Sequence, residues 1–247
     1  MSPEELAELI ESPDASAADC LLHLSSILSE RADALDIGHA ALEALATGVA
    51  EPSIPALVHH LFDEQKFTGD VDTYHAEQNS FLDRVLERRI GMPITLAAVV
   101  VEVGARIGLD LHLIGMPGHV VVGVAGDGSR FIDAFAGTEL DLSGLQRRFE
   151  AMFGRGIAVP PQSLAPIDTT SIVNRVCNNL TRTWAVNANN KLNRLLDVRV
   201  ALPSAPTERR LLIDIAEARG RFDLAARLRE EIDPNDPNIE TLWAKLN

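Results

Sequence analysis

Two residues in the middle of the chain, His119 and Asp133, have the types and the spacing of a catalytic pair. His119 begins an apolar run that is predicted to be a strand, and Asp133 ends the next such run. An imidazole can act as a base and then as an acid, and a carboxylate on its far ring nitrogen fixes the tautomer. A cysteine at a helix N-terminus would complete the set, because the positive end of the helix stabilises a thiolate. The pattern suggests the chemistry of a Cys-His-Asp hydrolase or transamidase.

Two predicted helices precede this pair. Asn79 and Ser80 are suitable N-caps for a short amphipathic helix over residues 81–89. A second helix is predicted over residues 94–107, with Pro93 at its start, where the missing N–H does no harm. Its β-branched residues would also suit a strand, but its length favours a helix, and its apolar character predicts burial on most sides.

Three short strands are predicted after the second helix. They are expected to pair in an antiparallel sheet packed on that helix, and they cover residues 111–114, 119–124 and 131–133. Residues 126–129, Gly-Asp-Gly-Ser, have the chemistry of a hairpin turn. The predicted fold class is therefore α+β, with a buried helix against a small antiparallel sheet.

Helices are predicted on both sides of this core. We expect an N-terminal helical section at residues 1–66, a core at residues 67–155 and a C-terminal helical region at residues 167–247, after a linker with three prolines. In the last region, residues 171–198 are predicted as one long helix, and the paired helices around Gly220 favour a tetratricopeptide-like unit. Such units commonly form interaction surfaces, so we expect a protein partner to bind there.

The composition limits the classes of partner. The chain has 247 residues, of which 46% are hydrophobic, so it can bury a substantial core. Its formal net charge of -14 would repel phosphate backbones and anionic membranes, and its 4% of aromatic residues offers few platforms for stacking bases. It has no apolar run of transmembrane length and no basic signal-peptide region, and its two cysteines are far apart. We therefore expect a cytoplasmic protein that binds neither nucleic acid nor membrane.

Three motifs resemble those of one bacterial family. They are NSFLDRVLERRIGMPITL at residues 79–96, GMPGHVVV at residues 115–122 and IDAFAG at residues 132–137. That family joins a transglutaminase-like core to tetratricopeptide-type helices, and its members are often described as invasion-gene regulators of type B. The resemblance is strong over residues 67–140. It implies a transglutaminase-like (papain-like) fold flanked by N-terminal helices and a C-terminal tetratricopeptide-like region.

The same resemblance implies roles for individual residues. His119 corresponds to the catalytic histidine of the transglutaminase superfamily, and Asp133 to its aspartate. The nucleophilic cysteine corresponds to Ile94, or to Thr95 with a shift of one residue. Isoleucine has no nucleophile, and the hydroxyl of Thr95 has a pKa far above that of a thiol. Cys-dependent catalysis is therefore predicted to be absent.

Three hypotheses follow for the function. The first is a binding or regulatory protein whose cleft, formed by Asn79, Pro93, Ile94, Gly118 and the His119–Asp133 pair, takes a peptide or small molecule. The second is an active hydrolase or acyltransferase that uses Thr95 or a displaced Cys177 with His119 and Asp133. The third is a structural adaptor in which the helices alone act. His119 and Asp133 are too few ligands for a zinc site, and no cofactor is predicted.

Overall fold

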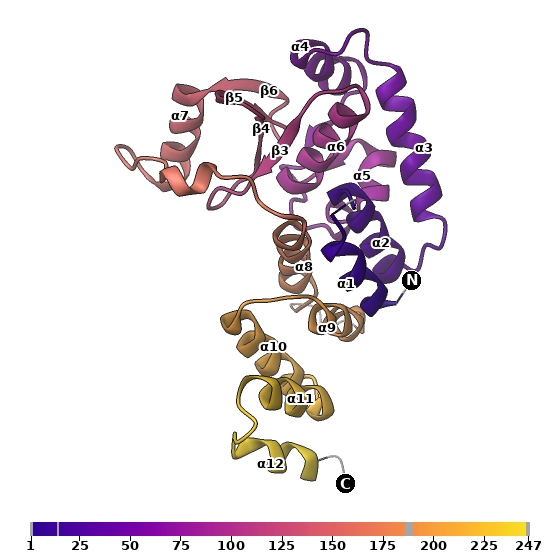
Figure 1. The fold of residues 1–247 in the computed structure, drawn as a ribbon, viewed down its shortest axis with the longest axis vertical. Helices are drawn as coiled ribbons and strands as arrows, with labels where there is room; N and C mark the ends of the chain where they lie inside the picture. Colours follow the sequence, from indigo (N-terminus) through magenta and orange to yellow (C-terminus); the bar gives the residue numbers. More distant parts are fainter. Residues whose placement is uncertain (1, 14, 186–189, 246–247) are drawn as a thin grey trace.

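The computed structural model describes residues 2–13, 15–185 and 190–245, and it contains a four-stranded sheet between two sets of helices (Figure 1). The α-helices are α1 (Pro3–Glu11), α2 (Ala17–Ser29), α3 (Ala34–Thr47), α4 (Ile54–Val58), α5 (Leu82–Arg88), α6 (Pro93–Arg106), α7 (Leu142–Phe153), α8 (Thr169–Ala185), α9 (Lys191–Ala201), α10 (Pro206–Ala218), α11 (Phe222–Ile232) and α12 (Asn238–Ala244). The strands are β1 (Thr68–Gly69), β2 (Ile90–Gly91), β3 (Leu111–Ile114), β4 (Val121–Val124), β5 (Asp127–Asp133) and β6 (Thr138–Asp141). One π-helical turn, η1 (His59–Glu64), and two 3₁₀ turns, η2 (Glu77–Asn79) and η3 (Pro161–Leu164), complete the described elements.

Helix α6 is the buried centre of the molecule. Its apolar side chains pack in one continuous core with those of α2, α3 and α5 and with one face of the sheet. The apolar periodicity of α2 explains why this helix joins the core, since its leucines are fully buried. Hydrophobic contacts therefore run across the boundary predicted between the N-terminal helical section and the core at residue 66. The boundary itself remains a prediction.

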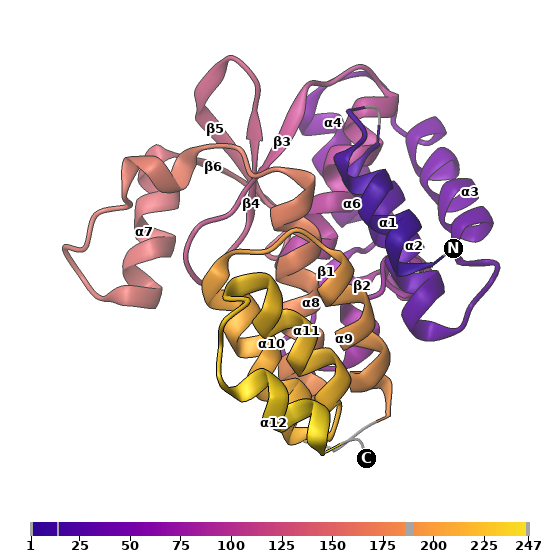
Figure 2. The same ribbon diagram turned by 60° about the horizontal axis from the view of Figure 1, so that its bottom comes forward.

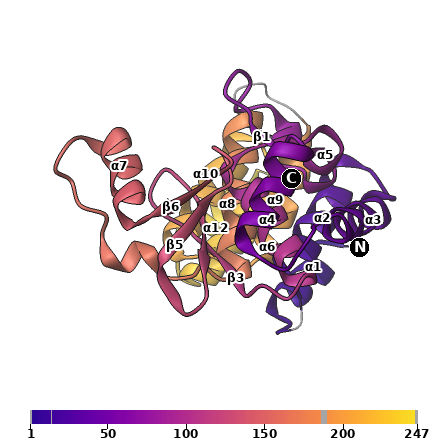
Figure 3. The same cartoon turned by 90° about the horizontal axis from the view of Figure 1, so that it is seen from above.

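The sheet has the order β3-β4-β5-β6 and is antiparallel throughout. Its side chains alternate between two faces, as the period of a strand requires. Val122 and Ile132 join the core of α6, whereas Val121 and Phe131 join a second cluster with Leu145 of α7. The sheet thus lies between α6 and α7 (Figure 3).

Local sequence patterns predicted three of the four strands of the sheet but not the fourth. Strand β6 was not predicted, and helix α7 follows it directly at Leu142. Asp141 separates the two elements, because its carboxylate accepts a hydrogen bond from Gly144 N at 2.7 Å and caps α7. Strand β4 starts at Val121, so His119 lies in the loop before it.

The predicted caps of α5 were wrong. The N-cap residue is Phe81, and the backbone N–H of Leu82 donates to Ser25 Oγ of α2 at 3.0 Å. Asn79 is fully buried and instead donates to Asp70 Oδ2 at 2.9 Å. A tertiary partner, which no local pattern reveals, has replaced the local cap.

Replacing Ser25 with Ala is expected to destabilise the fold by about 1–3 kcal/mol, because it leaves the buried N–H of Leu82 without an acceptor. Equilibrium denaturation in urea measures this loss. Ser29→Ala is the matched control, since the half-buried hydroxyl of Ser29 only donates back to Ser25 O at 2.7 Å. Equal midpoints for the two variants would contradict the tertiary cap.

The proline-rich connection after α7 returns to the sheet. Ile167 N donates to Leu113 O at 2.9 Å, and Pro166 forms a bridge with Ile114 of β3. This contact places the start of α8 beside the sheet, and α8 then packs on α2 and α6. The prediction of a single helix over residues 171–198 was wrong at Asn190, a turn residue directly before α9, and residues 186–189 of that range lie outside the described part of the chain.

Helices α10, α11 and α12 pack side by side at the C-terminal end of the chain (Figure 2). They share a second apolar cluster that is centred on Leu212, Ala216 and Leu228 and that reaches Leu196 of α9. No helix in the described ranges has both the length and the apolar character needed to cross a membrane.

Candidate functional site

His119 and Asp133 are in direct contact. His119 Nε2 lies 3.1 Å from Asp133 Oδ1, and this oxygen also accepts hydrogen bonds from the backbone N–H groups of Phe135 and Ala136 at 3.1 Å. An ionised carboxylate can only accept hydrogen bonds, so the Nε2 of His119 carries the proton in this contact. The other ring nitrogen, Nδ1, is not part of it. Gly118 precedes the histidine with a φ of 70°, and this left-handed conformation turns the loop so that His119 reaches the end of β5.

The buried charge of Asp133 has a second partner. Arg148 Nη2 of α7 lies 2.5 Å from Asp133 Oδ2. The guanidinium of Arg148 and the carboxylate of Asp133 are not oriented as a hydrogen bond. At this distance their opposite charges nevertheless attract and compensate each other. Burial alone would raise the pKa of Asp133. The hydrogen bond from His119 and the charges of His119 and Arg148 outweigh it and hold the pKa below its ordinary value.

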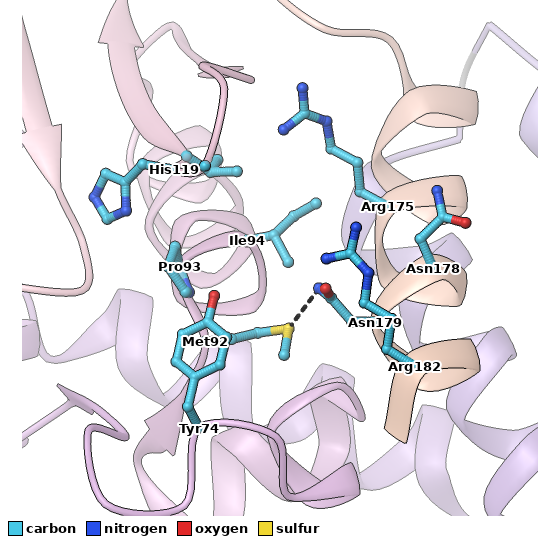
Figure 4. A pocket seen from close by; sticks show the side chains of 11 residues that line it. Tyr74, Met92, Pro93, Ile94, His119, Arg175, Asn178, Asn179 and Arg182 are labelled. Carbon is cyan, nitrogen blue, oxygen red and sulfur yellow. Dashed lines mark hydrogen bonds between the residues drawn. The ribbon is translucent and has the colours of Figure 1, made fainter. Parts of the chain in front are cut away.

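A cavity of about 230 Å³ opens beside this pair (Figure 4). It lies between the N-terminus of α6, the loop at residues 118–120 and one face of α8. Its lining consists of Tyr74, Met92, Pro93, Ile94, Gly118, His119, Val120, Arg175, Asn178, Asn179 and Arg182. The residue types in this lining suit ligand binding, since apolar side chains form one wall and cationic or amide side chains form the other.

A family model described as the transglutaminase-like superfamily matches residues 22–178. This chain belongs to that superfamily. The match runs from α2 into α8, so it includes N-terminal helices as well as the sheet. The transglutaminase-like part of the predicted fold is thereby confirmed.

Relatives of the chain occur in several bacteria. A UPF0162 protein of Xylella fastidiosa (strain Temecula1) is 35% identical over 136 residues, which are 53% of this chain and 48% of the relative. A UPF0162 protein of Vibrio cholerae is 28% identical over 122 residues, or 49% and 45% of the two chains. The chain thus spans about half the length of the curated bacterial relatives that it matches.

A short similarity reaches beyond the bacteria. The mouse F-box only protein 21 is 29% identical over 69 residues, which are 28% of this chain and 11% of that protein. No solved structure matches the chain.

The two residues that the resemblance aligns with the superfamily's nucleophile have different positions. Ile94 lines the cavity (Figure 4). Thr95 does not, because it is fully buried and its hydroxyl donates to Asn79 O at 2.8 Å. Met92 N also donates to Thr95 Oγ1 at 3.2 Å, so the hydroxyl serves the backbone at the start of α6.

The alternative nucleophile, Cys177, points into the core. Its side chain is fully buried within α8, and burial raises the pKa of its thiol to about 12. A thiol in this state is inert, because only the thiolate attacks. Within the part of the chain that the structure describes, no cysteine, serine or threonine lines the cavity.

Three of the four predicted binding residues, Pro93, Ile94 and Gly118, line the cavity. The fourth, Asn79, lies behind it. Its amide donates to Thr73 O at 2.9 Å, and its Oδ1 accepts from Arg88 Nη1 at 3.0 Å. Asn79 therefore holds the loop that carries Tyr74 into the cavity wall.

The cavity wall contributed by α8 was not predicted from the sequence. Arg175, Asn178, Asn179 and Arg182 are spaced at i, i+3, i+4 and i+7, so they share one face of the helix. This spacing was visible in the sequence, but it indicates only a polar face. The return of the preceding connection to β3 decides that the face meets His119.

In the described residues, no three side chains of His, Cys, Asp or Glu form a group that could hold a metal ion. The site can offer hydrogen bonds, positive charge and an imidazole.

Proposed function

We propose that this transglutaminase-like protein binds a ligand in the cavity beside His119 and Asp133 and does not use Cys-dependent catalysis. The observation that carries the proposal is the composition of the N-terminus of α6. Met92, Pro93 and Ile94 form that wall of the cavity, and none of the three can attack a carbonyl carbon. The histidine and aspartate keep their mutual contact, so the site retains a base and its positioning carboxylate, with no cysteine, serine or threonine among the described residues of the lining.

An active hydrolase or acyltransferase is the alternative. Thr95 would have to give up its hydrogen bonds to Asn79 O and Met92 N before its hydroxyl could turn towards a substrate. Cys177 would have to leave the core and lose its proton despite a pKa of about 12. Both changes disrupt buried contacts, so the geometry favours binding.

The C-terminal helices are the second half of the proposal. We propose that α10–α12 form a tetratricopeptide-like unit that recruits a protein partner. A tight turn at Gly220, with a φ of 72°, joins α10 to α11, as in a helical hairpin. Leu211 and Trp243 are 48% and 39% exposed, so both offer apolar surface to a partner.

A labelling experiment tests the absence of a nucleophile. Iodoacetamide and a fluorophosphonate probe are expected to leave the folded protein unmodified, because Cys20 and Cys177 are buried and burial raises the pKa of each thiol to about 12. Mass spectrometry detects any adduct, and the denatured protein, in which both thiols react, is the positive control. Labelling of the folded protein that disappears in His119→Ala would overturn the proposal.

A further inference from the structure

We propose that the cavity recognises a carboxylate group, carried by the C-terminal end of a peptide or by a small amino-acid-like molecule. The inference rests on the proposed binding function and adds the chemical class of the ligand. Three features support it: the unpaired positive charge in the lining, the directions of the charged groups and the free acceptors beside them.

The lining is cationic although the chain is acidic. The sequence has 36 acidic and 22 basic residues, yet the described lining of the cavity contains two arginines and no carboxylate. Arg175 donates only to backbone carbonyls, to Gly115 O at 2.7 Å and to Met116 O at 3.4 Å, and burial lowers the pKa of its guanidinium. Arg182 is exposed and forms no ion pair with a described residue. Neither guanidinium group therefore has an anionic partner among the described residues, and a carboxylate fits their planar fork.

The positive groups surround a common space. Arg175 and Arg182 are two turns apart on α8, or about 10 Å along the axis, and both extend from α8 towards the side formed by α6 (Figure 4). Opposite them is the N-terminus of α6, a helix of 14 residues whose first turn lines the cavity. The positive end of its dipole faces the same space as the arginines, and such helix ends attract anions.

The remaining polar groups suit a ligand that also carries N–H donors. Asn178 uses its Nδ2 on Glu208 Oε1 at 3.2 Å, and Asn179 uses its Nδ2 on Met92 Sδ at 3.1 Å. Their carbonyl oxygens have no partner among the described residues, and neither does His119 Nδ1. A peptide end supplies amide N–H groups beside its carboxylate, which inorganic phosphate does not. The volume of about 230 Å³ is below the roughly 300–1,000 Å³ of pockets for drug-sized ligands, so it suits one or two residues.

The test is a titration of the full chain, labelled with ¹⁵N, with N-acetylglycylglycine, with N-acetylglycylglycinamide and with inorganic phosphate. The free-carboxylate dipeptide is expected to shift the amide resonances of Met92, Ile94 and residues 118–120 and 175–182, and to bind at least tenfold more tightly than the other two probes. Arg175→Met and Arg182→Met are each expected to weaken its binding about tenfold or more, because each removes a charge-assisted contact.

Two controls separate binding from folding. Arg210→Met removes one exposed charge from α10, away from the cavity lining, and is expected to bind like the native protein. Arg182→Met keeps the inference testable if Arg175→Met fails to fold, since Arg182 forms no hydrogen bond with a described residue. Equal binding of the amide, tighter binding of phosphate, or no shift around the cavity would each overturn carboxylate recognition. These titration outcomes would overturn carboxylate recognition alone. The proposed function fails on a different result, the labelling of the folded protein that disappears in His119→Ala.

Discussion

A cysteine introduced at Pro93 or at Ile94 is expected to react with iodoacetamide at pH 6 about tenfold faster than a cysteine in an unstructured peptide. Both positions lie in the first turn of α6 and line the cavity with His119. If the helix end and the imidazole lower the thiol pKa from about 8.5 to about 6, the thiolate fraction at pH 6 rises from about 0.3% to about 50%. The weaker nucleophilicity of such a thiolate removes about tenfold of that gain. The rate is measured by the loss of free thiol.

Matched variants identify the source of the reactivity. The double variants that add His119→Ala are expected to lose most of the rate advantage, because the imidazole then no longer stabilises the thiolate. Thr95→Cys is the positional control, since residue 95 is fully buried and outside the cavity. If Pro93→Cys and Ile94→Cys both react as slowly as Thr95→Cys, the start of α6 does not face the histidine, and the idea of a lost nucleophile fails. If one of Pro93→Cys and Ile94→Cys reacts faster than Thr95→Cys, the faster of the two identifies the position at which the site lacks its nucleophile.

Asp133→Ala is expected to lower the free energy of unfolding by about 3–5 kcal/mol. The substitution leaves the N–H groups of Phe135 and Ala136 without their acceptor, and it removes the partner of His119. It also leaves the Arg148 charge beside an apolar site. Denaturation in guanidinium chloride measures the loss. Asp133→Asn keeps an oxygen acceptor and is expected to lose less, so an equal loss in both variants would assign the whole effect to the charge.

The same carboxylate predicts a dependence on pH. The pKa of Asp133 in the folded chain lies below its ordinary value of about 3.9, so the unfolded chain binds this proton more readily. Its contribution to stability is therefore complete above the unfolded pKa and is lost as the pH falls through the folded pKa. The difference in Tm between the native protein and Asp133→Asn is expected to shrink from pH 6 to pH 3. A constant difference would show that the charge of Asp133 is not stabilising.

Local patterns predicted the elements that carry the His-Asp pair. Helix α6 starts at Pro93 and ends at Arg106, within one residue of its predicted range, because its length and its apolar character are local properties. Strand β3 matches its predicted range for the same reason. The approach of His119 to Asp133 could also be anticipated, since neighbouring antiparallel strands bring their ends together.

The rest of the site depends on contacts that are distant in sequence. Arg148 reaches Asp133 because α7 packs on the outer face of the sheet, and no spacing in the sequence records that packing. Tyr74 enters the cavity from a loop held by Asn79, a residue for which the local pattern suggested only a cap. The arginines of α8 lie about sixty residues beyond His119, and the path of the chain alone brings them back.

That path has a further consequence for the sheet. Strand β3 is an outer strand in the order β3-β4-β5-β6, and an uncovered outer strand can pair with another chain. Pro166 and Ile167 lie along this edge and occupy Leu113 O. The connection therefore protects the sheet against intermolecular pairing, and Pro166 adds no N–H that could extend it. The segment that brings the cationic wall to the cavity also shields one edge of the sheet from aggregation.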